Sequence, residues 1–256
     1  MSSARVYNNS GENRKEIGVK LEISGEEINE LETCFQVLDQ LKECEVQHIR
    51  KSRKFRKTNK PWNDHCLNSR KSIGALVYLY KEGKCNSTAS FKNYYLKSGE
   101  DLQQYPDKDF CYHGRTIVEL TQLAKQFHSI LGSEYLFSEV CQYIWIRIFF
   151  ETNEGVQREL KALLKFQLQN PELEIQSCGV EKDFKFAIDA EVFKSGRLIY
   201  AIQVKSMSYL KDQQVILKQT KRFNHRKQEL YTKQYKVPVY HLIANKKGDI
   251  LDFVMI

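Results

Sequence analysis

The sequence lacks an apolar stretch long enough to cross a membrane. Its longest apolar run, Tyr143 to Phe150, is interrupted by Arg147 and is far shorter than the roughly 20 residues that a crossing needs. The first residues lead into polar sequence, without the apolar stretch of a signal peptide. The seven cysteines are an odd number at irregular spacing, which favours reduced thiols over a disulfide framework. We therefore expect a cytoplasmic protein that is neither membrane-spanning nor exported.

Several motifs that would announce a function are also missing. The chain contains no GxxxxGK[ST] phosphate loop, which argues against ATP-driven translocation, and no Ser or Cys nucleophile signature. Cys44 and His48, together with His65 and Cys66, lack the second CxxC or HxxxH pair of a zinc site. Core cysteines and hydrogen-bonded histidines are the favoured interpretation of these four residues.

The 256 residues, 41% hydrophobic and 28% charged, are sufficient for one large domain or two small ones. Residues 1–18 are polar, lack apolar periodicity and are expected to form a flexible tail. Residues 19–150 carry helical patterns, and residues 151–256 carry strand patterns after one more helix. The expected fold is α/β, with a helical N-terminal region followed by a mixed β-sheet flanked by helices.

Positive charge is concentrated in two segments. The chain has 40 Lys+Arg against 32 Asp+Glu, a net charge of +8. Residues 50–71 contain nine basic residues and one acid, and residues 211–236 contain eight basic residues and two acids. Clustered cations favour a nucleic-acid backbone because they release its counterions, although an ordinary solvated surface remains the alternative. The predicted DNA-contacting residues are Arg53, Lys54, Arg56, Lys57, Lys218, Lys221, Arg222 and Arg226.

In the first half, capping boxes mark two helices. Ser24 with Glu27 precedes a helical apolar pattern, and Thr116 with Glu119 precedes another that Gly132 ends. A buried helix is predicted over residues 134–150, and a further one from after Thr152 to Asn170. The basic segment is predicted to be a loop.

Two residues of this half leave alternatives open. Within the basic segment, Trp62 would either stack on a base or sugar, or anchor the loop. Arg115 at a helix start would either touch a phosphate or serve in a plain cap.

In the second half, short segments of β-branched or alternating residues predict strands over residues 173–180, 184–193 and 198–204. A basic helix over residues 211–235 separates them from two further strands, residues 238–244 and 250–254.

Polar residues interrupt two of these apolar strands. Asp189 lies within one, and Gln203 and Lys205 within the next, and buried charge is costly unless it is paired or binds metal. Residues 194–197 make the two strands a hairpin, with Gly196 suited to a positive φ. A three-residue loop would place Asp189 on the face of Gln203 and Lys205, whereas a two-residue loop would place them on opposite faces. On a shared face, side chains about 5 Å apart could bind one divalent cation.

A carboxylate, a second oxygen ligand and a lysine suit metal-assisted phosphodiester hydrolysis. A hard cation polarises the phosphoryl group, and a lysine can orient the attacking water. Glu159 borders the inward face of the preceding helix and could add a ligand. Glu154, Glu172 or Glu174 could take its place, and Glu191 is a reserve ligand on the Asp189 face. The alternative for Asp189 and Lys205 is a solvent-facing ion pair.

These residues resemble the motif of the PD-(D/E)xK nuclease superfamily, and the overall build looks like type II restriction endonucleases. The likeness rests on Glu159, then Asp189, then Gln203-Val204-Lys205 after one hairpin, over about residues 151–254. The resemblance implies a restriction-endonuclease-like core in which Glu159 and Asp189 bind Mg²⁺, Gln203 assists and Lys205 positions water. The Val204 carbonyl is a possible further ligand. The chain departs from the family pattern at Ile188, where the family has proline, and at Gln203, where it has Glu.

The implied function is Mg²⁺-dependent, type II restriction-like cleavage of double-stranded DNA at a specific site, by a homodimer. The helical region would support target recognition. The alternatives are a structure-specific nuclease, such as a junction resolvase or repair nuclease, and a DNA-binding protein that does not cut.

Overall fold

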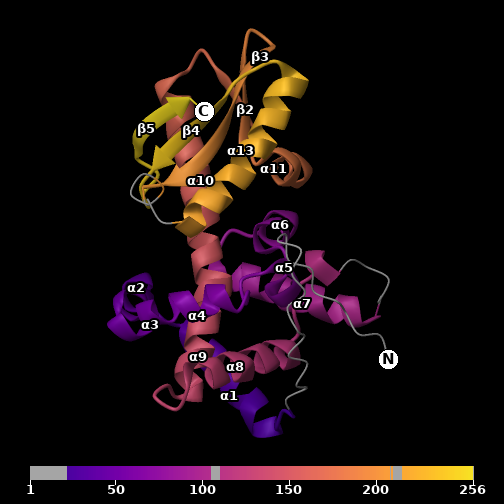
Figure 1. Ribbon diagram of the computed structural model, residues 1–256, viewed down its shortest axis with the longest axis vertical. Coiled ribbons are helices and arrows are strands. Elements are labelled where there is room, and N and C mark those ends of the chain that lie inside the picture. Colours follow the sequence, from indigo (N-terminus) through magenta and orange to yellow (C-terminus); the bar gives the residue numbers. More distant parts are fainter. Residues whose placement is uncertain (1–21, 105–109, 208, 210–214, 256) are drawn as a thin grey trace.

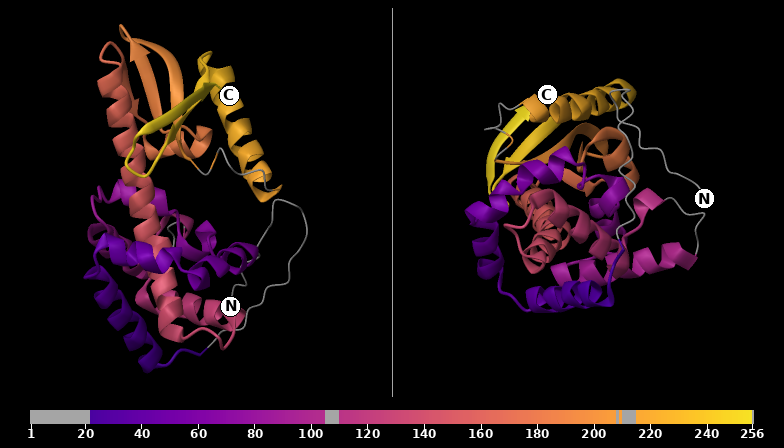
Figure 2. Two further views of the ribbon diagram at one scale, coloured as in Figure 1. Left: turned by 90° about the vertical axis from the view of Figure 1, so that its left-hand side faces the viewer. Right: turned by 60° about the horizontal axis from the view of Figure 1, so that its bottom comes forward.

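The computed structural model describes residues 22–104, 110–207, 209 and 215–255. The described chain forms a helical part at one end of an elongated molecule and a sheet-containing part at the other (Figures 1 and 2). The flexible tail predicted for residues 1–18 lies outside the described residues.

The helical part is built from short and medium helices. They are α1 (Gly25–Asp39), α2 (Glu43–Lys51), α3 (Arg53–Lys57), α4 (Asn59–Asp64), α5 (Arg70–Ile73), α6 (Leu76–Glu82), α7 (Thr88–Gln104), the short 3₁₀ turn Phe110–Tyr112, α8 (Ile117–Leu131) and α9 (Phe137–Trp145). Their apolar faces share one core that includes Leu31, Phe35, Phe91, Leu120 and Ile144, all almost fully buried.

Both predicted capping boxes are confirmed. The Ser24 and Thr116 side chains accept hydrogen bonds from the backbone N–H of Glu27 and Glu119, whose carboxylates accept in return from the cap backbone. Gly132 ends α8 with φ +86°, in the region that suits glycine.

The loop predicted for the basic segment is wrong, because this stretch forms α3, α4 and α5. Ser52 caps α3 by accepting from the Phe55 N–H, and Phe55 and Trp62 are buried. Trp62 packs edge-to-face against Phe127, with ring centroids 5.1 Å apart. Burying two aromatic rings favours helices that direct them inward, so Trp62 is an anchor of the helical core.

Arg115 is also structural, which removes the phosphate contact considered for it. Its side chain is 2% exposed, and its guanidinium donates to the backbone carbonyls of Arg70, Lys71, His113 and Gly114.

The two helices predicted on either side of residue 151 are one continuous helix. After α9 the chain makes a π-helical turn, η2 (Ile146–Phe150), and continues as α10 (Glu151–Gln169), with helical backbone angles at both junctions. The segment between them contains no glycine, proline or cap to end a helix. The helix runs from the helical part into the sheet-containing part (Figure 1), and Asn170 ends it before Pro171, as predicted.

The sheet has five strands in the order β1-β2-β3-β4-β5. They are β1 (Glu174–Ser177), β2 (Ala190–Lys194), β3 (Arg197–Ser206), β4 (Val239–Ala244) and β5 (Ile250–Met255). Only β3 and β4 pair in parallel, and the other neighbours are antiparallel. The helix α13 (Val215–Tyr235) supplies the crossover from β3 to β4.

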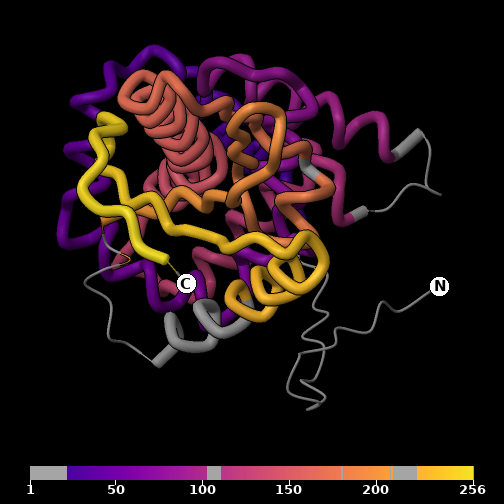
Figure 3. Tube along the Cα trace, turned by 90° about the horizontal axis from the view of Figure 1, so that it is seen from above, coloured from indigo at the N-terminus to yellow at the C-terminus, as the bar shows by residue number. Residues whose placement is uncertain are grey.

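Helices cover both faces of the sheet (Figure 3). On one face, Ala162, Leu163 and Phe166 of α10 pack against residues such as Val192 and Leu242. On the other face, Tyr231 of α13 and Phe186 pack against Ala201 and Val239. The expectation of an α/β fold with a helix-flanked mixed sheet is therefore confirmed.

The strand predicted for residues 184–193 begins later than expected. A helix, α11 (Val180–Phe186), occupies its first part and ends at Ala187, whose φ of +53° is left-handed. The predicted β1 is likewise shorter, because α11 already starts at Val180.

Within the described residues, no helix has both the length and the apolar character that a membrane crossing requires.

Candidate active site

The β2–β3 hairpin determines which polar side chains meet. Lys194 pairs with Arg197, so the loop is the two residues Ser195 and Gly196, both at positive φ. The register shifts by one residue between Val192 and Phe193, so that Ala190 pairs with Ile202. Extending that register by one residue brings Asp189 opposite Gln203. A β-bulge therefore produces the alignment that was expected only from a three-residue loop.

Asp189 immediately precedes β2, rather than lying within the strand as predicted, and is held in place by three hydrogen bonds. Its N–H donates to the Ile202 carbonyl and its carbonyl accepts from the Cys178 N–H, both at 2.8 Å. Its carboxylate Oδ2 accepts from the Val204 N–H at 2.7 Å. The side chain is thus fixed toward β3, in a residue that is only 7% exposed.

The charge of Glu159 on α10 affects the pKa of Asp189, and the charge of Asp189 affects the pKa of Lys205 on β3. Burial, then the charges of Glu159 and Asp183, raises the pKa of Asp189 well above its ordinary value. Burial also raises the pKa of Glu159, although Lys81 opposes this effect. Burial lowers the pKa of Lys205, and the charge of Asp189 counteracts that change. The solvent-facing ion pair considered for Asp189 and Lys205 is wrong, because Asp189 is only 7% exposed.

Two charged residues of this cluster escaped prediction from the sequence. The Lys81 ammonium, on α6, is 3.0 Å from Glu159 Oε1 and 3.5 Å from Asp183 Oδ2. Burial by itself would lower the pKa of Lys81, but the charges of Glu159 and Asp183 outweigh it and the pKa is raised. Lys81 is 78 residues from Glu159 and 102 from Asp183 in sequence, and Asp183 lies between two predicted strands, so no local pattern indicated either.

The side-chain amide of Gln203 is bound by a residue of α13 and not by the charged cluster. Its Oε1 accepts from Gln228 Nε2 of α13 at 2.7 Å, and the same Gln228 nitrogen lies 3.0 Å from the Ala187 carbonyl. Gln228 also lies 3.3 Å from His241 Nε2 of β4, the residue paired with Gln203. The amide of Gln203 therefore ties β3 to α13.

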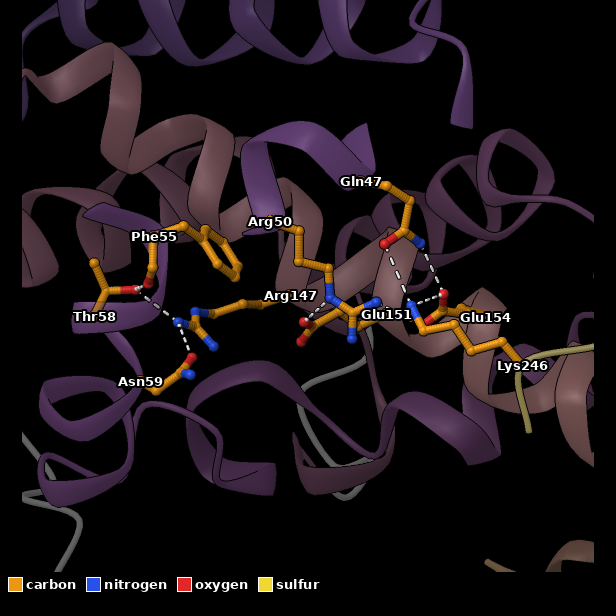
Figure 4. A network of polar contacts seen from close by, with 9 residues as sticks. All are labelled: Gln47, Arg50, Phe55, Thr58, Asn59, Arg147, Glu151, Glu154 and Lys246. Carbon is orange, nitrogen blue, oxygen red and sulfur yellow. Dashed lines mark hydrogen bonds and ion pairs between the residues drawn. The ribbon is translucent and has the colours of Figure 1, made fainter. Parts of the chain in front are cut away.

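The other carboxylates considered for the site are engaged elsewhere or exposed. Glu154 of α10 binds Gln47, Arg50 and Lys246 at 2.6–2.8 Å, in a network that joins the helical part to the turn after β4 (Figure 4). Glu191 is 7% exposed and binds Lys182 and Tyr231, both at 2.7 Å. Glu172 and Glu174 are exposed. Glu159 is thus the glutamate that accompanies Asp189.

The donor chemistry of the cluster fits a hard divalent cation, but the present spacing does not bring the donors together. Glu159, Asp183 and Asp189 supply carboxylate oxygens, and their charges repel one another, which an added cation would relieve. Among the described residues, no group of three or more His, Cys, Asp and Glu side chains could hold a metal ion as placed. In this structure it is the Lys81 ammonium that lies between two of the acids. The interpretation of Cys44 and Cys66 as core cysteines is wrong, because both are exposed.

The predicted DNA-contacting residues divide into three groups. Arg53, Arg56 and Lys57 on α3 are exposed, as is Arg226 on α13. Lys54 instead pairs with Glu139. The side chains of Lys218, Lys221 and Arg222 lie outside the part that the structure describes.

A separate cavity of about 420 Å³ lies between α1, α7 and the long helix. Its lining includes Trp145, Asn153, Glu154 and Gln157, and it does not include Glu159, Asp189 or Lys205. The charged cluster is thus distinct from this hollow.

Comparison with known proteins gave no match to a family model, to a curated protein or to a solved structure.

Proposed function

We propose that this protein is a Mg²⁺-dependent endonuclease that hydrolyses phosphodiester bonds in double-stranded DNA, in the manner of type II restriction enzymes of the PD-(D/E)xK superfamily. The observation that carries the proposal is that Glu159, Asp189 and Lys205, from three separate elements, lie near enough to shift one another's pKa values, with Asp189 buried. A fold rarely accepts such unfavourable charge burial without a function for it.

The surrounding topology supports the same proposal. The order helix, hairpin, crossover helix and parallel strand is the context in which the resemblance places these residues, and it is the order of α10, β2, β3, α13 and β4. Fold similarity alone would not indicate an activity, so the weight rests on the charged side chains.

The roles of the residues follow from their chemistry. The carboxylates of Glu159 and Asp189 would hold the magnesium ion, which would polarise the phosphoryl group and acidify a bound water. Burial lowers the pKa of Lys205. Its ammonium would orient the attacking water and offset charge on the phosphate. The Val204 N–H fixes Asp189, and Gln203 positions β3 against α13. A metal contact from the Val204 carbonyl stays a prediction.

The proposed substrate path runs over the exposed cations. Arg53, Arg56 and Lys57 of α3 and Arg226 of α13 would contact the DNA backbone, and such contacts set orientation more than sequence specificity. Cutting both strands of a symmetric site would require a two-fold dimer, which we retain as part of the proposal together with a cytoplasmic location.

Incubation of supercoiled plasmid DNA with the protein and Mg²⁺ tests the proposal. Discrete linear fragments are expected from the wild-type chain. Asp189→Asn and Lys205→Met should each lower cleavage by at least about a hundredfold while retaining DNA affinity. Lys97→Met, which removes an exposed lysine on α7, is the matched control. Normal cleavage by both site variants would refute the assignment.

One observation favours a second candidate, a DNA-binding protein that does not cut. The position where the family has a second acid is Gln203, and its oxygen is already bound by Gln228. Retained DNA binding with no cleavage in Mg²⁺ or Mn²⁺ by the wild-type chain would select this candidate.

A further inference from the structure

The Lys81 ammonium lies between two of the carboxylates of the candidate site. It contacts Glu159 at 3.0 Å and Asp183 at 3.5 Å, and its side chain is 19% exposed. The side chains of both partners are also mostly covered, with 14% of Glu159 and 25% of Asp183 exposed. In such partly buried surroundings, water screens the interaction only weakly.

Lys81 belongs to the helical part, whereas its partners belong to α10 and α11. Neighbouring contacts hold α6 against the long helix, because the Tyr80 hydroxyl donates to Asn153 Oδ1 at 2.7 Å and accepts from Gln157 Nε2 at 3.2 Å. The position of Lys81 is therefore built into the packing of the two parts.

The formal charges of the cluster show how Lys81 affects the binding of a divalent cation. The three carboxylates Glu159, Asp183 and Asp189 face the ammonium groups of Lys81 and Lys205, and the Arg158 guanidinium adds a further positive charge near Glu159. Adding a divalent cation alone would therefore leave a net positive charge in a poorly hydrated site. A backbone phosphate that enters with the cation offsets that charge.

We propose that Lys81 is a built-in counter-cation that opposes metal binding in the free protein and makes it depend on DNA. The inference rests on the proposed function, because it concerns the same carboxylates. When a phosphate enters, Lys81 exchanges its carboxylate contacts for the phosphate, and Glu159 becomes available to the divalent cation. Metal and DNA then bind cooperatively, and the coupling is reciprocal.

Mn²⁺ binding to the full chain, measured by titration calorimetry without DNA, tests this inference. Lys81→Met should tighten Mn²⁺ binding roughly ten- to hundredfold, because it removes the competing charge. Lys81→Arg keeps the charge and should bind Mn²⁺ as weakly as the wild type. Lys97→Met makes the same charge change on an exposed part of α7 and should have no effect.

A second titration adds a short DNA duplex. The duplex should increase the Mn²⁺ affinity of the wild-type chain. The increase should be much smaller for Lys81→Met. Equal effects of DNA on both chains, or unchanged Mn²⁺ affinity in Lys81→Met without DNA, would overturn the inference. If Lys81→Met does not fold, Lys81→Gln, which also removes the charge but keeps a polar side chain beside Glu159, should tighten Mn²⁺ binding in the same way.

These outcomes are separable from failure of the proposed function. Mn²⁺ binding that Asp189→Asn abolishes, but that Lys81→Met leaves unchanged, would retain the metal site and reject the role of Lys81. Absence of Asp189-dependent Mn²⁺ binding in the presence of DNA would reject both.

Discussion

At the scale of single residues, the candidate site is a place where charge is buried at a cost. Asp189 receives one strong hydrogen bond from the Val204 N–H, but its burial and the nearby carboxylates disfavour its ionised form. Groups held in this way reduce folding stability, and proteins retain them where they serve a function.

Asp189→Asn should therefore stabilise the metal-free protein while abolishing cleavage. The amide oxygen can still accept from the Val204 N–H, and the unfavourable buried charge is gone. We expect a gain of about 1 to 2 kcal/mol in the free energy of unfolding, measured by urea denaturation at pH 8 with a chelator. Asp252→Asn on β5, an exposed carboxylate, serves as the control and should change little. A destabilised Asp189→Asn protein would show that the charge supports the fold.

The pH dependence of stability provides an independent check. Asp189 and Glu159 have pKa values raised in the folded state, so the folded protein binds their protons more tightly than the unfolded chain does. Their stabilising contribution is therefore present at low pH and is lost as pH rises from about 4 through the raised pKa values. The stability difference between wild type and Glu159→Gln/Asp189→Asn should widen over this range in metal-free denaturation curves. A difference that stays constant with pH would contradict the raised pKa values.

At the scale of elements, the position of the site depends on small departures from regular structure. The bulge in the β2–β3 hairpin aligns Asp189 with Gln203, and the turn after β4 packs closely on α10. In that turn, Gly248 has φ +77°, and a Cβ there would lie 2.5 Å from Lys161 Cβ and 2.9 Å from the Lys161 backbone carbon. Lys161 is two residues from Glu159, so this contact helps to fix the glutamate.

Gly248→Ala should lower the free energy of unfolding by about 2 to 4 kcal/mol, because it combines backbone strain with a clash against α10. Gly132→Ala is the matched comparison: its φ of +86° is also left-handed, but a Cβ there meets nothing within 4 Å. That control should cost only about 1 kcal/mol. Equal losses in thermal or chemical denaturation would mean that close packing on α10 contributes nothing.

At the scale of the whole molecule, the surplus positive charge is divided between exposed and paired groups. Arg53, Arg56 and Lys57 are exposed on one short helix, whereas Lys54 of the same helix pairs with Glu139. Only cations that replace counterions on DNA contribute to the salt dependence of binding.

Substituting glutamine for Arg53, Arg56 and Lys57 together should flatten the plot of log affinity against log salt concentration. Each lost phosphate contact removes about 0.9 from its slope, so the triple variant should lose up to about 3. Lys54→Gln should leave the slope nearly unchanged, because that ammonium already has a carboxylate partner. Fluorescence anisotropy with a labelled duplex measures both. A triple variant with the wild-type slope would remove α3 from the proposed DNA surface.

The sequence by itself determined the features that depend on neighbours along the chain. The caps at Ser24 and Thr116, the helix end at Gly132, the hairpin turn at Gly196 and the order of the five strands around the crossover helix follow from short-range hydrogen bonds and apolar periodicity. The acid and the amine of the candidate site, Asp189 and Lys205, were found because charge in an apolar strand is conspicuous.

Only the tertiary structure decided what surrounds those two residues. The bulge that places Asp189 opposite Gln203 is a detail of the folded hairpin, and the binding of Gln203 by Gln228 and the contact of Lys81 from a distant helix depend on packing between segments far apart in sequence. Periodicity records which side of an element is apolar, whereas the strength of an electrostatic interaction depends on distance and burial in three dimensions. The positions of the charges around Asp189 are therefore a property of the folded chain and of no single segment.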